Sequence, residues 1–195
     1  MELKDNLPTF HARSAKEWRK WLEKNHRSEK SVWLIIYKKE SKVPSIYYPE
    51  AVDEALCFGW IDSKPNKRDE QSYYQFFAKR NPKSNWSKIN KLKVEKLLAQ
   101  NLMAPAGLES IKTAQQNGSW SALDEVENIS IPGDLGQAFD NNPKAFENWE
   151  RFPRSSKRGI LEWILNAKKE DTRKKRIEET VQLATKNIKA NHYNQ

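Results

Sequence analysis

The chain has 195 residues, of which 37% are hydrophobic and 11% aromatic, and its formal net charge is +9. A chain of this size and aromatic content can bury a substantial core, which excludes an intrinsically disordered polymer. Its apolar runs are far shorter than the roughly 20 residues of a membrane span, and its N-terminus has no signal-type hydrophobic stretch. The single cysteine, Cys57, excludes an intramolecular disulfide. We therefore expect a cytoplasmic protein.

The first half of the chain combines helix and strand patterns. Ser14 and Glu17 form a capping box that predicts a helix over residues 15–25. Residues 31–39 are rich in β-branched and aromatic side chains and predict a buried strand. A short helix begins near Pro49, and Gly59 is placed to end it.

The segment after Gly59 predicts a hairpin. Residues 60–63 and 73–78 read as two antiparallel strands, and Pro65 belongs in the connection or on a sheet edge because it lacks a backbone N–H. Together with the strand at 31–39 they would form a small sheet of about three strands. This region is therefore expected to be a compact α+β structure.

Beyond Pro82 the pattern is helical to the end of the chain. Helices are predicted over residues 88–99, from Pro105 to Gly118, after Pro132, after Pro143, from Ser155 to Ala167, and from Asp171 to Ile188. The fold class is therefore α+β: a small antiparallel sheet with N-terminal helices, followed by a mostly helical C-terminal half. We expect an α+β region over 1–100 and a helical region over 101–195, packed together as one compact unit.

The segment from Cys57 to Asn90 concentrates polar and aromatic side chains. A hairpin followed by a polar turn can gather a candidate ligand site: Trp60, Asp62, Arg80, Ser84, Trp86 and Asn90. A guanidinium suits a carboxylate or phosphate, and indole rings provide flat walls. In the alternative reading, which we favour, Asp62 pairs with Arg80, Ser84 caps a helix and both tryptophans belong to the core.

A second candidate is the basic run near the C-terminus. Arg173 and Arg176 lie about one helical turn apart, and Lys169 can join them, so the three could bind phosphates or anionic lipid head groups. In the alternative, which we favour, neighbouring acids such as Glu170 and Asp171 pair with these bases at a helix–helix corner.

Other chemistry is weakly signalled. His11, His26 and His192 have no metal-ligand spacing, so no metal is expected. Cys57 lies near a predicted helix C-terminus, where the dipole disfavours a thiolate. With only six glycines there is no phosphate-binding glycine loop. No catalytic motif and no cofactor signature is recognised, and the interpretation leans towards a protein that is not an enzyme.

Several motifs run in order along nearly the whole chain: Ala55–Ser63, Arg80–Asn90, Met103–Gly107, Gly118–Trp120 and Ala167–Ile177. Together they resemble one bacterial family, the YdeI/OmpD-associated proteins. The family is described through association with envelope components and protection against bacteriocins or cationic antimicrobial peptides. The resemblance implies a cytoplasmic bacterial protein with a helical C-terminal module. It brings no catalytic residue, cofactor or substrate.

Three functions remain open. The first is a non-enzymatic module that binds a small anionic ligand or a protein partner and is linked to envelope stress or antimicrobial-peptide protection. The second is nucleic-acid binding, because residues 64–96 and 151–195 each carry a net charge of +7 around a block, 97–150, of −6. It is not favoured, since such blocks are commonly solvated or neutralise one another. The third is an enzyme acting on a small anionic substrate. The oligomeric state is left open.

Overall fold

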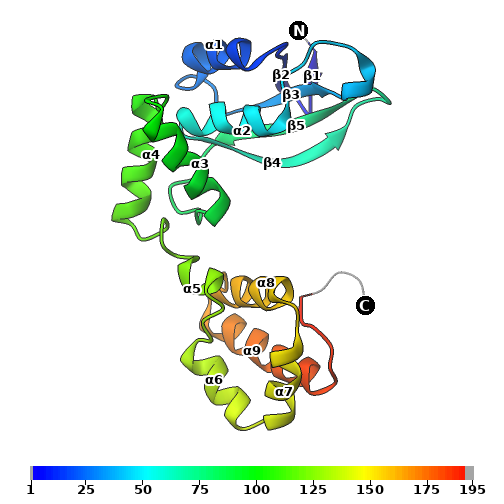
Figure 1. Ribbon diagram of the computed structural model, residues 1–195, viewed down its shortest axis with the longest axis vertical. Helices are drawn as coiled ribbons and strands as arrows, with labels where there is room; N and C mark the ends of the chain where they lie inside the picture. Colours follow the sequence, from blue (N-terminus) through cyan, green and yellow to red (C-terminus); the bar gives the residue numbers. More distant parts are fainter. Residues whose placement is uncertain (1, 192–195) are drawn as a thin grey trace. The chain divides into compact units, whose positions relative to one another are not determined.

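The computed structural model describes residues 2–191, which fall into two compact units divided between Ala122 and Leu123. The first unit contains a sheet with helices, and the second is helical (Figure 1). The predicted α+β class is confirmed. No helix among the described residues is both long enough and apolar enough to span a bilayer. The packing of the two predicted regions on each other stays a prediction.

The elements of the first unit mix strands and helices and end in two helices. They are β1 (Leu3–Lys4), β2 (Leu7–His11), α1 (Ala15–Asn25), β3 (Ser31–Tyr37), the short 3₁₀ helix η1 (Lys39–Ser41), α2 (Tyr48–Cys57), β4 (Trp60–Lys67), β5 (Ser72–Lys79), α3 (Lys88–Ala99) and α4 (Pro105–Gln116).

The sheet has the strand order β1-β2-β3-β5-β4, with β2 and β3 parallel and the other neighbours antiparallel. The sequence predicts about three antiparallel strands, which correspond to β3, β4 and β5. Two further strands come from the N-terminus. Asp5 and Asn6 both have positive φ, as a two-residue hairpin turn between β1 and β2 requires. Strands this short, one of them containing Pro8, show no clear alternation in sequence.

One face of the sheet and the helices of the first unit share a core. Val32, Leu34 and Phe77 project from the sheet into the same cluster as Trp18 of α1 and Leu56 of α2. On the opposite face, a smaller cluster is formed by Trp33, Ile35 and Tyr74. The strands are thus apolar on both faces, which explains the continuous hydrophobic run of β3.

The corner between α2 and β4 depends on two glycines. Gly59 ends α2 with φ +71°, a conformation that side-chain-bearing residues rarely adopt. Gly107 of α4 lies so close to α2 that an added Cβ would stand 2.3 Å from the Cys57 carbonyl oxygen. That same oxygen accepts a hydrogen bond from the Ala104 amide (3.0 Å). The corner therefore holds the first half of α4 directly against the end of α2.

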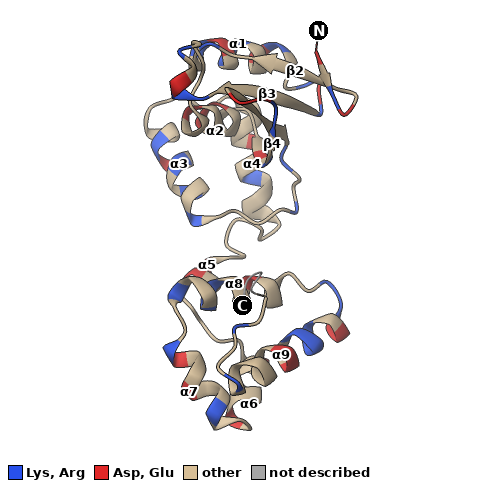
Figure 2. Cartoon of the chain, turned by 90° about the vertical axis from the view of Figure 1, so that its right-hand side faces the viewer, with Lys and Arg blue, Asp and Glu red and all other residues tan. Residues whose placement is uncertain are grey.

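The second unit consists of helices around its own core. They are α5 (Asp124–Glu127), α6 (Gly133–Asp140), α7 (Pro143–Arg151), α8 (Arg154–Leu165) and α9 (Glu170–Thr185). Leu135, Trp149 and Ile164 are fully buried in this core. The Asn148 side chain donates a hydrogen bond to the Ala184 carbonyl (2.8 Å) at the end of α9. Lys and Arg residues occur on helices of both units (Figure 2).

Candidate ligand-binding pocket

The end of β5 is tied to the Gly59 corner. The Arg80 amide donates a hydrogen bond to the Gly59 carbonyl oxygen (3.0 Å), which fixes where the Arg80 side chain begins. Its guanidinium carbon lies 3.8 Å from the centre of the Trp86 ring, a cation–π contact. Trp86 is buried and packs on Trp120, with ring centres 5.0 Å apart. Two of the six predicted site residues, Arg80 and Trp86, are therefore in direct contact.

The other predicted site residues have local roles. Asp62 accepts a hydrogen bond from the Tyr48 hydroxyl and forms no ion pair with Arg80; burial lowers the pKa of Arg80, and the charge of Asp62 opposes that effect. The Ser84 hydroxyl donates to the Asn81 carbonyl within a turn (2.8 Å). The Asn90 amide donates to the Ser87 hydroxyl, which caps α3. Trp60 is buried, and its ring nitrogen donates to the His26 carbonyl (3.4 Å).

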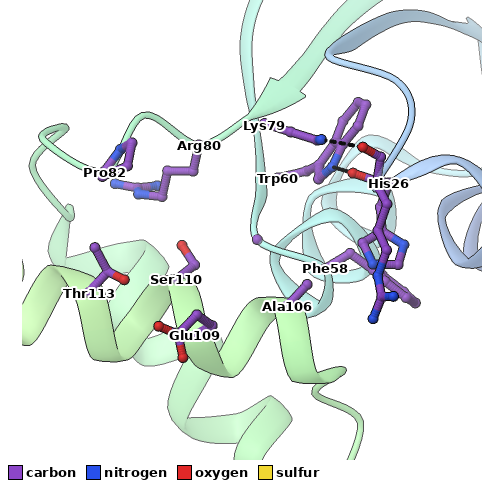
Figure 3. Close-up of a pocket in the computed structure, with 12 residues that line it drawn as sticks. His26, Phe58, Trp60, Lys79, Arg80, Pro82, Ala106, Glu109, Ser110 and Thr113 are labelled. Atoms are coloured by element: carbon purple, nitrogen blue, oxygen red, sulfur yellow. Dashed lines mark hydrogen bonds between the residues drawn. The ribbon is translucent and has the colours of Figure 1, made fainter.

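A pocket of about 340 Å³ opens between this corner and α4 (Figure 3). Its walls include Trp60, Lys79 and Arg80 from the sheet side and Glu109, Ser110 and Thr113 from α4. The Arg80 guanidinium extends along the upper wall near Pro82, and Ser110 points up from α4 towards it. The sequence analysis did not predict the three α4 residues, because they lie far from Arg80 along the chain and no motif joins them. Their position in the pocket wall follows from the close approach of α4 to α2 at Gly107.

Arg80 is the unusual charge in this pocket. Its Nε and Nη1 atoms are buried and have no hydrogen-bond partner within residues 2–191, while Nη2 donates to the Asn85 carbonyl oxygen. Burial lowers the pKa of Arg80 to about 10, so the group is still charged at neutral pH. A buried guanidinium without a carboxylate partner is disfavoured in free energy. The Arg80 guanidinium is thus a cation at the pocket wall, and the N–H groups on its Nε and Nη1 atoms are unpaired.

The right-hand end of the pocket in Figure 3 is built by Lys79 and by the turn after α1. The Lys79 ammonium donates to the Arg27 carbonyl (2.7 Å), and the Nδ1 atom of His26 lies 2.8 Å from the Leu22 carbonyl. The side chains of Arg27 and Lys79 are exposed. These groups add positive charge near the mouth of the pocket, which favours a negatively charged ligand.

The candidate basic patch of the second unit is arranged differently. Arg173 binds Asp134 through two hydrogen bonds, Nε to Oδ2 (2.6 Å) and Nη2 to Oδ1 (2.9 Å). Arg176 donates to the Trp163 carbonyl and lies over the Trp163 ring. Lys169 stands at the N-cap of α9. Both arginines thus have partners within the unit.

Few other groups offer chemistry. Cys57 is buried, and burial raises the pKa of its thiol. The described part of the chain contains no group of three or more His, Cys, Asp and Glu side chains that could hold a metal ion. His192 lies outside the described residues. Of the aromatic side chains in β5, Tyr74 and Phe77 are buried on opposite faces of the sheet.

Two protein-family models match the chain, one within each structural unit. Residues 10–110 match the family model described as "Domain of unknown function (DUF8412)". Residues 128–187 match the model described as "Bacteriocin-protection, YdeI or OmpD-Associated". The resemblance noted in the sequence is therefore supported over 128–187, whereas the motifs around Gly59 and Arg80 fall within the first match. No curated protein and no solved structure gives a significant match.

Proposed function

We propose that this chain, which belongs to the DUF8412 family of domains of unknown function through residues 10–110, binds a small anionic ligand in the Arg80 pocket. In this proposal the first unit is a non-enzymatic binding module. The second unit carries a YdeI/OmpD-associated domain. Its description supports a role of the whole protein in bacteriocin protection. In this proposal the role extends to envelope stress and is exerted from the cytoplasm through the ligand or through a protein partner.

The observation that carries the proposal is the unpaired guanidinium. Guanidinium groups bind carboxylates and phosphates through short charge-assisted hydrogen bonds. In Arg80, burial against Trp86 removes water from the group, and no carboxylate of the described residues takes its place. An anion in the adjoining pocket would supply the missing acceptors. If Arg80 served only to pack the fold, an apolar side chain of similar length would destabilise the protein less.

The pocket supplies further contacts for such an anion. The hydroxyl groups of Ser110 and Thr113 come from the α4 wall, and Lys79 adds a second positive charge. The Nε and Nη1 atoms of Arg80 have almost no exposed surface, so a ligand reaches them as the side chain turns towards the pocket. Binding should therefore be accompanied by a local rearrangement around Arg80 and Trp86.

The proposal is tested by calorimetric titration of the full chain with inorganic phosphate and with acetate. Arg80→Met removes the charge and keeps the length of the side chain. Arg151→Met is the matched control, because Arg151 is exposed on α7 and pairs with Glu147 outside the pocket. We expect wild type and Arg151→Met to bind at least one of the two anions and Arg80→Met to bind neither. Equal binding by all three proteins would overturn the proposal.

A further inference from the structure

The Arg80 pocket also contains an unpaired negative charge. Glu109 on α4 lines the pocket, its side chain is exposed, and it forms no ion pair within residues 2–191. Lys112 lies one helical turn further along α4, at a spacing that permits a pair, but none forms. Among the described lining residues Glu109 is the one acid.

The two opposite charges stand on different walls. Arg80 comes from the chain that leaves β5, and Glu109 comes from the helix below it, with Ser110 between them in the view of Figure 3. They do not neutralise each other, because no ion pair joins them. A purely anionic ligand at Arg80 would be repelled by Glu109. A ligand that carries a cation as well would satisfy both walls.

We infer that the ligand of the Arg80 pocket is a zwitterion, with its carboxylate or phosphate at Arg80 and its ammonium group at Glu109. This inference rests on the proposed function and narrows its ligand class to amino acids, short peptides or amino-alcohol phosphates. A pocket of about 340 Å³ accommodates a molecule of that size. Ser110, which also lines the pocket, can contact the anion or the ammonium, since a hydroxyl both donates and accepts.

Glu109→Gln separates the two ligand classes, because it removes the charge and keeps the shape. Without the repulsion, a simple anion should bind more tightly; without the attraction, a zwitterion should bind more weakly. For a partly solvated charge pair each change should be about fivefold in affinity, in opposite directions. Glu95→Gln on α3 is the control, since Glu95 is an exposed acid outside the pocket.

The experiment compares acetate, propionate and butyrate with glycine, β-alanine and 4-aminobutyrate, and phosphate with phosphoethanolamine, by calorimetry on the full chain. The first series varies the distance between the charges, and the second tells a carboxylate from a phosphate source. We expect one zwitterion to bind more tightly than its parent anion in wild type and in Glu95→Gln, with the order reversed in Glu109→Gln.

The possible outcomes distinguish the zwitterion inference from the proposed anion site at Arg80. If acetate or phosphate binds through Arg80 but no zwitterion gains over its parent anion, the zwitterion inference is wrong and the proposed anion site stands. The zwitterion inference is also wrong if Glu109→Gln shifts the affinities of both ligand classes in the same direction. If neither class binds in a manner that depends on Arg80, the proposed function fails together with the inference.

Discussion

Buried and half-buried arginines occur in both units, but their surroundings differ. In the second unit, Arg158 lies between Glu127 (2.8 Å) and Glu162 (2.9 Å), and Arg173 is held by Asp134. In the first unit, Arg80 has two buried, unpaired nitrogens and no carboxylate partner among the described residues. The first kind of arginine is compensated by its own fold. The second kind destabilises the fold, and destabilisation of this type is typical of a binding site.

The largest expected effect concerns Gly107 of the first unit, with Gly159 of the second unit as the comparison. Gly107→Ala should destabilise the first unit by about 3 kcal/mol, because the new methyl group would collide with the Cys57 carbonyl, a backbone atom that has little room to move. Gly159 lies in the interior of α8, and a Cβ added there would meet nothing within 4 Å. Gly159→Ala should therefore stabilise the second unit by about 1 kcal/mol. Hydrogen exchange resolved by peptide measures each unit in the full chain. Equal and small effects at both glycines would contradict the packing described at the corner.

The next largest difference is expected between an arginine with carboxylate partners, Arg158, and one without, Arg80. Arg158→Met should destabilise the second unit by about 2 kcal/mol, because it leaves Glu127 and Glu162 without their shared partner. Arg80→Met should leave the first unit unchanged or stabilise it by about 1 kcal/mol, because it removes a desolvated charge. Chemical denaturation with peptide-resolved hydrogen exchange distinguishes the two. A loss of stability in Arg80→Met as large as that in Arg158→Met would mean that Arg80 is structural.

The pH dependence of binding gives a further contrast. Burial lowers the pKa of Arg80 to about 10, so the protonated, anion-binding form is lost as the pH rises through that value. Acetate keeps one charge above about pH 6, so acetate affinity that depends on Arg80 should be constant from there to about pH 9 and then, once the pH exceeds the pKa, fall by about tenfold per pH unit. The titration is repeated in Arg151→Met as a control for general charge loss. Affinity that declines already near neutral pH would point to a different titrating group.

The smallest effect is expected at Asp134. Arg173 holds the pKa of the Asp134 carboxyl below its usual range, so the pair stabilises the fold above the unfolded-state pKa and this stabilisation is lost as the pH falls through the lowered value. Asp134→Asn should therefore cost less than about 1 kcal/mol at neutral pH and nothing in strong acid, because the pair is partly exposed. An unfolding titration at both pH values measures the difference. A cost that persists in acid would assign it to packing instead.

Local signals in the sequence predicted much of the fold. The capping serine at Ser14, the end of α2 at Gly59 and the prolines at the starts of α6 and α7 each mark an element that the structure contains. The N-terminal strands β1 and β2 were not predicted, because both are short, β2 pairs with β3 through a parallel crossover, and β1 pairs with β2. Long-range pairing of this kind leaves little trace in a single sequence.

The candidate site was only partly predicted, because one of its walls also depends on contacts between residues far apart in the sequence. Arg80 and Trp86 are six residues apart and lie in one turn, so their contact could be anticipated from the sequence. The opposite wall, with Glu109 and Ser110, follows β5 by some thirty residues and reaches the pocket through the Gly107 contact. The favoured pairing of Asp62 with Arg80 is not formed; the Asp62 carboxylate accepts a hydrogen bond from the Tyr48 hydroxyl instead.

The central claim is that the unpaired guanidinium of Arg80 receives the ligand. It is tested most directly by NMR of the arginine Nε–H groups in the full chain, with Arg80→Met and Arg158→Met assigning two of the signals. On addition of phosphate or of the best-bound zwitterion, the Arg80 signal should shift and its exchange with water should slow, while the Arg158 signal stays in place. An unchanged Arg80 signal at a ligand concentration that saturates the protein would contradict this claim.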